Sequence, residues 1–215
     1  MPPLLPAILI GAASLIFLAW LLRFAAKASK RSHESFSRLA EGLELTLEPP
    51  EMTLGLFRSA PRAGGQRRGK KLELFTYTTG SGKSRTTWAA ISAQPRADGG
   101  LKFKLTRQGL GSKIAQLFGT KEIQVGDAAF DAAWFIETNR ADFFAAALLP
   151  ELRARIHEGT QGATRASFKL EHGKVVYSEV GGFFDEARCA RLALMADVVS
   201  DFADIAEVNA TGAGR

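Results

Sequence analysis

The first twenty-two residues constrain this chain more than any other part of its sequence. Residues 4–22 read LLPAILIGAASLIFLAWLL and contain no charged side chain. A helix rises about 1.5 Å per residue, so this run is long enough to cross the roughly 30 Å hydrocarbon core of a bilayer. A helix packed on a soluble core would show an amphipathic period, which this run lacks. The sequence therefore predicts an N-terminal transmembrane helix.

The charges that flank the apolar run predict its orientation. No Lys or Arg precedes the run, and the basic residues follow it before the first acid, Glu34. A cleaved signal peptide has the opposite arrangement, and the positive-inside rule places the N-terminus outside and the rest of the chain in the cytoplasm. We therefore expect an anchor and basic juxtamembrane segment over residues 1–31. Its expected membrane-interface residues are Trp20, Arg23, Lys27, Lys30 and Arg31.

The rest of the chain has the size and composition of one globular domain. Of the 215 residues, 46% are hydrophobic and 23% are charged, which excludes collagen-like and wholly disordered classes. The single cysteine, Cys189, excludes an intramolecular disulfide and a metal site with several cysteine ligands. We expect one cytoplasmic domain over residues 32–208, followed by a frayed tail over residues 209–215.

Hydrophobic periodicity predicts an α+β fold with a mainly antiparallel sheet and late packing helices. Strands and helices do not alternate regularly along the chain, which argues against a parallel sheet. The element count also permits a bent seven-stranded sheet closed by a C-terminal helix, as in pleckstrin-homology domains. The expected strands cover residues 43–47, 52–57, 72–79, 85–93, 101–107, 122–125, 134–138, 166–171 and 174–179. The expected helices cover residues 32–42, 112–118, 139–157 and 185–208, with Asn139 as an N-cap and a break at Pro150.

The positive charge of the chain is concentrated in its middle. Residues 57–121 carry fourteen basic and two acidic side chains, whereas residues 122–215 carry nine basic and fifteen acidic ones. A basic surface beside an anionic leaflet would gain about 1 kcal/mol for each Lys or Arg close to it. Two alternatives stay open, namely neutralisation of these cations by the acidic helices and binding of nucleic acid. The residues predicted to bind an anionic surface belong to an expected loop over residues 62–71: Arg62, Arg67, Arg68, Lys70 and Lys71.

No motif in the sequence meets the requirements of a catalytic, metal or cofactor site. Residues 80–84 (GSGKS) end like a phosphate-binding loop, but a strand rather than a helix is expected after them. We therefore predict no catalytic residue, no metal and no cofactor. The one enzyme alternative is a site near Asp127 and Asp131, although Asp127 is also suited to cap a helix. The three histidines are expected on the surface, and Cys189 is expected to pack as a small apolar residue.

One stretch resembles a known group of proteins. Gly126, Asp127, Phe130, Asp131 and Trp134 fall in the pattern Gly-Asp-x-x-Phe-Asp-x-x-aromatic. The segment Pro-Glu-Leu-Arg at 150–153 and a hairpin followed by a helix come after it. This arrangement is similar to a group of uncharacterised bacterial proteins that combine this motif with an N-terminal membrane segment. The resemblance implies a bacterial origin and membrane association, and it implies no activity.

These observations together predict a single-pass protein of the bacterial inner membrane. Its cytoplasmic domain is expected to be a binding or scaffold module for an unidentified partner, oriented on the anionic inner leaflet by the basic loop. The alternatives are a membrane-tethered enzyme with a site near Asp127 and Asp131, and a basic domain that binds nucleic acid.

Overall fold

The computed structural model describes residues 17–20, 23, 27, 30–49, 52–53, 57–58, 60–108 and 121–212. The predicted transmembrane segment lies outside this range except for residues 17–20, and the predicted helix over residues 112–118 lies outside it entirely. Within the described ranges, no helix is both long and apolar enough to cross a bilayer.

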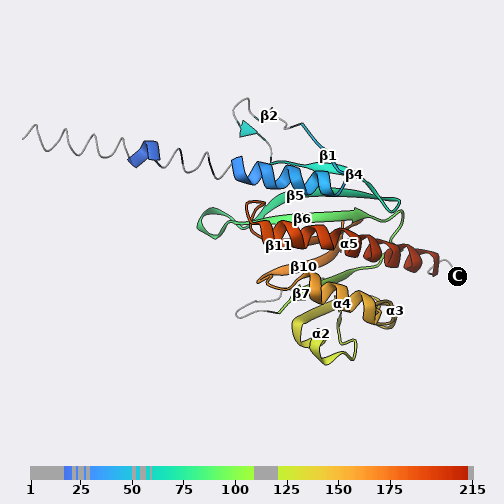
Figure 1. The fold of residues 1–215 in the computed structure, drawn as a ribbon. Helices are drawn as coiled ribbons and strands as arrows, with labels where there is room; N and C mark the ends of the chain where they lie inside the picture. The colour runs from blue at the N-terminus through green and yellow to red at the C-terminus, as the bar shows by residue number, and fades with distance from the viewer. Residues whose placement is uncertain are drawn as a thin grey trace, which may run out of the picture.

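Nine strands of the described part form one antiparallel sheet (Figure 1). Their order across the sheet is β1-β4-β5-β6-β11-β10-β7-β9-β8, so neighbours in space are often far apart in sequence. A short separate hairpin pairs β2 (Met52–Thr53) with β3 (Phe57–Arg58). The strands of the large sheet are β1 (Thr46–Leu47), β4 (Ala63–Arg67), β5 (Lys70–Thr79), β6 (Thr86–Gln94), β7 (Phe103–Arg107), β8 (Lys121–Ile123), β9 (Trp134–Thr138), β10 (Ala166–Glu171) and β11 (Lys174–Val180).

The helices of the described part come before the sheet, between its later strands and after it. A helix over residues 30–42 precedes β1. The others are α2 (Ala128–Ala133), α3 (Ala141–Ala147), α4 (Pro150–Gly159) and α5 (Glu186–Gly212). A 3-10 turn, η1 (Gly82–Ser84), lies in the connection between β5 and β6.

The hydrophobic core lies between the helices and one face of the sheet. Side chains alternate between the two faces of a strand, and Leu72 and Leu74 of β5 point into this core without exposure. On the helix side, the ring of Phe202 in α5 lies 5.0 Å from that of Phe103 and 5.2 Å from that of Phe168. The helix over residues 30–42 adds Phe36, whose side chain is 1% exposed. The fold therefore depends on α5 and this first helix covering the same face.

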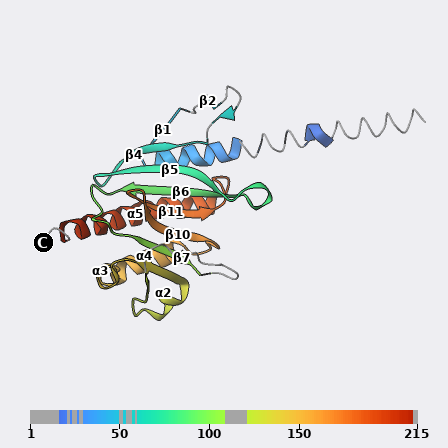
Figure 2. The same ribbon diagram turned by 180° about the vertical axis from the view of Figure 1, so that it is seen from behind.

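The opposite face of the sheet is formed by strands, as the view from behind shows (Figure 2). Ala90 of β6 and Val176 of β11 are buried on this face but do not belong to the main core. They alternate with the core residues Ile91 and Tyr177 along the same strands. We call this face the strand face.

Most of the expected elements are confirmed, including the α+β class, the helix before the sheet, the β10–β11 hairpin and the long C-terminal helix. The break at Pro150 is also confirmed, because α3 ends before it and α4 begins with it. Asn139 does not cap α3. Its side chain instead accepts a hydrogen bond from the Lys102 backbone N–H at 2.7 Å and donates one to the Gly100 carbonyl at 2.8 Å.

Other expectations are wrong. The described sheet has nine strands, so the seven-stranded pleckstrin-homology arrangement is not the one found. The expected tail does not fray at residue 209, because α5 continues to Gly212. Asn209 is 6% exposed, and its amide donates to the Asp98 carbonyl at 2.9 Å, which fixes this end of the helix.

The expected basic loop over residues 62–71 is a β-hairpin. β4 and β5 pair from Ala63 opposite Leu74 to Arg67 opposite Lys70, and Arg68 and Gly69 form the turn with positive φ angles. Gly64 and Gly65, which suggested a loop, lie in β4 and allow its backbone to approach neighbouring segments closely. A Cβ on Gly65 would lie 2.9 Å from a methyl carbon of Leu45. The absence of a side chain at Gly65 therefore lets β4 pack closely against the segment around Leu45.

The two ends of the molecule along the strands carry different features. At one end, the helix over residues 30–42 begins, β5 turns into β6, and β11 leads into α5 (Figures 1 and 2). Phe36 lies 4.8 Å from Phe183 between ring centroids, and Arg38 lies 3.3 Å from Glu186, which joins the first helix to the start of α5. We call this the entry end. The β4–β5 turn and the C-terminus of α5 lie at the opposite end.

Candidate functional site

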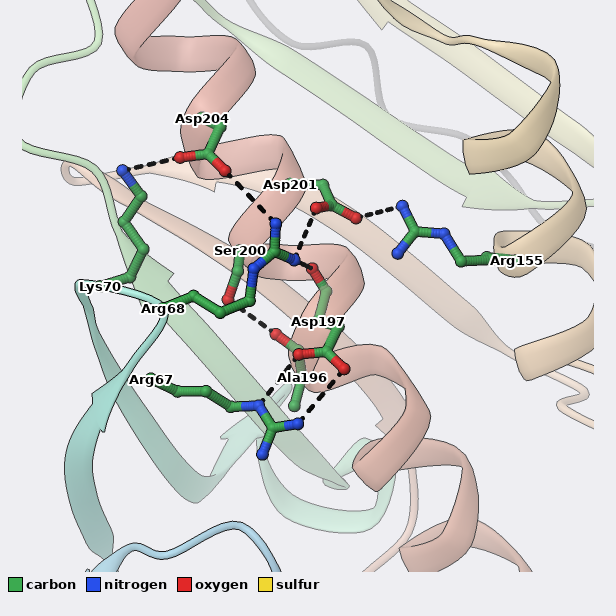
Figure 3. Close-up of polar contacts among 9 residues, drawn as sticks. All are labelled: Arg67, Arg68, Lys70, Arg155, Ala196, Asp197, Ser200, Asp201 and Asp204. Atoms are coloured by element: carbon green, nitrogen blue, oxygen red, sulfur yellow. Dashed lines mark hydrogen bonds and ion pairs between the residues drawn. The ribbon is translucent and has the colours of Figure 1, made fainter.

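The basic residues predicted to bind an anionic surface lie against α5. Arg67, Arg68 and Lys70 flank the β4–β5 turn and face a row of carboxylates on the helix (Figure 3). The distances are 2.9 Å from Arg67 Nε to Asp197 Oδ1, 2.7 Å from Arg68 NH1 to Asp201 Oδ1, 2.9 Å from Lys70 Nζ to Asp204 Oδ1 and 2.6 Å from Lys70 Nζ to Glu207 Oε1.

These pairs keep the three cations charged. Hydrogen bonding to Asp197 raises the pKa of Arg67. The Lys70 side chain is 5% exposed, and its burial alone would lower its pKa. Hydrogen bonds to Glu207 and Asp204 outweigh that burial, so the pKa of Lys70 is raised. The alternative of neutralisation by acidic helices is therefore confirmed for this hairpin.

The other two predicted surface-binding residues also have partners. Lys71 Nζ lies 3.1 Å from a carboxylate oxygen of Glu73, and the Arg62 guanidinium lies 5.8 Å from the centroid of the Phe75 ring. Binding of all five to an anionic surface stays a prediction, and it would have to compete with these internal contacts. Of the predicted membrane-interface residues, all five are exposed, and Lys30 lies 3.8 Å from Glu34.

The motif at residues 126–134 forms a helix start held by two carboxylates. Asp127 caps α2 by accepting a hydrogen bond from the Phe130 N–H at 3.1 Å, which confirms its expected role as an N-cap. This bond is the main reason that the pKa of Asp127 is lowered, and a contact with Arg153 at 3.1 Å adds to it. Asp131 accepts from the backbone N–H groups of Val125 and Gly126 at 3.0 and 3.1 Å.

The two aspartates do not converge on one cleft. Asp127 lines a shallow pocket of about 210 Å³ together with Arg153, His157 and Glu158. Asp131 lines a separate, more open hollow on the other side of α2. No group of three metal-ligating side chains occurs within the described ranges. Both carboxylates therefore already serve the local structure, and the enzyme alternative stays a prediction.

A row of aromatic side chains crosses the strand face. Phe75 and Tyr77 follow each other on this face of β5, and Trp88 of β6 lies directly opposite Tyr77 in the register. The Tyr77 and Trp88 rings are 6.1 Å apart and inclined by only 7°, and the Phe75 ring lies 6.2 Å from Tyr77. All three are half-buried, so part of each ring remains accessible. We call these three residues the aromatic row.

Each ring of the aromatic row has a cation over it. The Arg165 guanidinium lies 5.3 Å from the Trp88 ring, the Lys169 ammonium lies 5.7 Å from the Tyr77 ring, and Arg62 covers Phe75 as described above. The cations come from two distant parts of the sequence, Arg62 before β4 and Arg165 with Lys169 at β10. The Lys169 ammonium also pairs with the Glu171 carboxylate. The strand face thus combines apolar ring surface with the positive charge of Arg62 and Arg165.

Small residues allow Tyr77 to reach across the sheet. Its hydroxyl donates to Ser178 Oγ of β11 at 3.0 Å, and Ser178 Oγ lies 3.1 Å from Ser167 Oγ of β10. Ala90 lies on β6 between Tyr77 and Ser178, and it is fully buried. A larger side chain at residue 90 would displace the Tyr77 side chain from the surface of the sheet. The position of Tyr77 in the aromatic row therefore depends on the small residues beside it.

A buried polar cluster lies on the core side of β11. Glu179 is 2% exposed and receives hydrogen bonds from Arg191 at 2.7 to 3.1 Å and from the Tyr177 hydroxyl at 2.6 Å. Burial and the Glu179 carboxylate raise the pKa of Tyr177 well above its ordinary value, so its hydroxyl remains a donor. Cys189 packs nearby with its pKa raised by burial, as expected for an apolar role.

The sequence analysis did not identify the aromatic row. The signal was present in the spacing, because Phe75 and Tyr77 are two apart and alternate with Leu72 and Leu74. The strand order, which brings Arg165 and Lys169 of β10 to this row, has no local signal. The histidines are exposed as expected.

Comparison with known proteins gives a likeness in fold. No family model matches the chain, and no curated protein matches it. Among solved structures, the crystal structure of the mycobacterial trehalose monomycolate transport factor A, TtfA, is similar to this chain. The TM-score is 0.52 with 13% sequence identity, over 81% of this chain and 93% of TtfA.

Proposed function

We propose that this chain is a membrane-tethered binding module whose strand face binds an anionic amphiphile. Residues 4–22 would anchor it in the bacterial inner membrane with the domain in the cytoplasm. The aromatic row with its three cations carries the proposal. The resemblance of residues 126–134 to membrane-anchored bacterial proteins agrees with it.

The chemistry of the aromatic row suits a ligand with an apolar part and an acidic part. The partly exposed ring faces offer apolar contact, and burial of apolar area contributes about 25 cal/mol per Å². A cation over an exposed ring gains only about 0.5–1 kcal/mol. A hydrogen bond to a charged ligand group is worth about 1.5–3 kcal/mol, so Arg165 can leave the Trp88 ring for a phosphate or carboxylate, whereas Lys169 would also have to leave Glu171.

The likeness to TtfA agrees with the apolar part of such a ligand. TtfA is named for the transport of trehalose monomycolate. At 13% identity the likeness concerns the fold, and we extend only the lipid-like class of ligand to this chain as part of the proposal.

Titration of the full chain with octyl phosphate tests the proposal. The chain is kept in nanodiscs of neutral lipid, and octyl phosphate is compared with octyl glucoside, which has the same alkyl chain length and no charge. We expect saturable binding of octyl phosphate by calorimetry. Arg165→Gln should weaken it about tenfold or more, because one charge-assisted hydrogen bond is lost.

Lys174→Gln is the matched control. Lys174 lies on the neighbouring strand β11, but its ammonium pairs with Glu73 at 2.6 Å. The substitution should leave the affinity unchanged. Equal weakening by both variants, or no saturable binding, would contradict the proposal. Binding of a short single-stranded oligonucleotide in place of octyl phosphate would favour the nucleic-acid alternative.

A further inference from the structure

We propose that the entry end of the domain docks on an anionic bilayer through Lys83, Arg85 and Arg165. This inference rests on the anchor of the proposed function, and it moves the membrane contact away from the β4–β5 hairpin. It concerns a surface different from the ligand-binding strand face, although Arg165 borders both.

Lys83 and Arg85 are exposed in the connection between β5 and β6, and Arg165 is exposed just before β10. Backbone contacts join these segments at one end of the central strands β6, β11 and β10. The Val180 N–H donates to the Arg165 carbonyl at 3.2 Å, and the Gly181 N–H donates to the Thr87 carbonyl at 2.8 Å. The three cations therefore belong to one end of the molecule, where β11 leads into α5.

These cations lack the internal partners that neutralise the β4–β5 hairpin. Within the described part of the chain, no ion pair involves Lys83, Arg85 or Arg165. Arg165 lies over Trp88, which leaves its charge unbalanced. Three acids of the same end are already paired: Glu34 with Lys30, Asp185 with Arg188 and Glu186 with Arg38. These three acids therefore do not offset the positive charge of Lys83, Arg85 and Arg165.

The chain enters the domain at this same end. The helix over residues 30–42 runs from there, and its Phe36 and Arg38 contact Phe183 and Glu186 at the start of α5. Phe184, which follows Phe183 in the chain, is 63% exposed, and the Arg188 guanidinium lies 5.7 Å from the centroid of its ring. An exposed aromatic among cations is typical of a surface that meets the headgroup region of a bilayer.

Distance excludes the β4–β5 hairpin from the same contact. Its carboxylate partners begin at Asp197 and end at Glu207, which is eleven to twenty-one residues after the start of α5. At about 1.5 Å per residue the hairpin lies some 17–32 Å further along the helix. Attraction to a charged surface decays over about 8 Å at physiological salt, so a membrane that contacts the entry end would attract the hairpin only weakly.

The test places a fluorophore at each end of the full chain. Cys189→Ala removes the native thiol, and Ser81→Cys or Gln66→Cys provides a label beside Lys83 or on the β4–β5 hairpin; both sites are exposed. The chain is reconstituted into vesicles of phosphatidylcholine with or without phosphatidylglycerol, which contain a headgroup-linked quencher. We expect stronger quenching at Ser81→Cys with phosphatidylglycerol, and reversal when salt rises from about 0.05 M to about 0.5 M.

Charge variants identify the residues responsible. Lys83→Gln with Arg85→Gln should lower the ratio of docked to undocked domain about tenfold or more, because two of three surface charges are lost. Arg96→Gln with Lys102→Gln removes two exposed cations near the opposite end and should have no effect. Equal quenching at Ser81→Cys in both lipids, or stronger quenching at Gln66→Cys, would overturn the docking surface.

Absence of the predicted membrane anchor gives a different experimental result from absence of the docking surface. A chain that does not float with phosphatidylcholine vesicles refutes the anchor. Docking is then read from the same two labels when anionic vesicles are added to the free chain, so each hypothesis has its own outcome.

Discussion

The buried pair of Glu179 and Arg191 should be a major source of stability, and its removal gives the sharpest test of the core. The Arg191 guanidinium donates to both oxygens of Glu179, whose side chain is 3% exposed, against 14% for Arg191. Arg191→Met leaves the carboxylate buried with the Tyr177 hydroxyl and the more distant Arg188 at 3.9 Å. An uncompensated buried charge costs about 3–5 kcal/mol.

The expected loss of stability in Arg191→Met is large enough to measure by thermal and urea unfolding. For a domain of this length, 1 kcal/mol corresponds to about 2–4 °C in melting temperature, so Arg191→Met should lower it by about 6–20 °C. Urea unfolding of the full chain in neutral detergent gives the free energy directly. The double variant with Glu179→Gln should cost less than the sum of the singles, with a coupling of about 2 kcal/mol or more.

An exposed pair provides the control. Arg155 contacts Asp201 with a side chain that is 48% exposed, and Arg155→Met should cost less than about 1 kcal/mol. If Arg191→Met costs no more than this control, or if the two single effects simply add, the buried pair is not a coupled unit and the reasoning is wrong.

Two further predictions concern α5. Glu207 has its pKa lowered from 4.5, first by the Arg96 backbone N–H and then by Lys70. Because the pKa is lower in the folded state, its contribution is present above the unfolded value and lost as the pH falls through the folded one. Glu207→Gln should therefore flatten the loss of urea stability between about pH 5 and pH 3, and an unchanged slope would count against this pairing. Gly99 has a φ of +57°, and an added Cβ would lie 2.6 Å from Ala210 Cα, whereas Gly100 with φ +73° faces open space. Gly99→Ala should cost about 1–3 kcal/mol and speed hydrogen exchange at the end of α5, more than Gly100→Ala does; equal effects would show that only the backbone angle matters.

A strand or helix can be predicted from the sequence where the residue spacing within that one element determines its burial pattern and its ends. The alternation of Leu72 and Leu74 with Phe75 and Tyr77 identifies β5 and both of its faces. Asp127 three residues before Phe130 identifies the start of α2, and the capping bond is found there. Burial and capping are local consequences of spacing, so they can be predicted from one sequence.

The strand order could not be predicted, because it depends on contacts between distant segments. β6 pairs with β11, more than eighty residues later, and β10 pairs with β7. No turn residue or period encodes these neighbours. The composition of the strand face could not be predicted for the same reason, because Trp88 and Arg165 come together only when β6, β11 and β10 are assembled.

Which cations have internal ion pairs also depends on contacts between distant segments. Asp197, Asp201 and Asp204 are spaced four and three residues apart, which places them on one side of a helix. That spacing also fits a solvated helix face, and only the hairpin register brings Arg67, Arg68 and Lys70 against it. A search for an anionic-surface site by the density of basic residues therefore selects the hairpin, where the charge is already neutralised. A search by cations without internal ion pairs selects Lys83, Arg85 and Arg165, at the end where the helix over residues 30–42 enters. Because attraction to a membrane acts on net local charge and over short distances, the second criterion is the physical one.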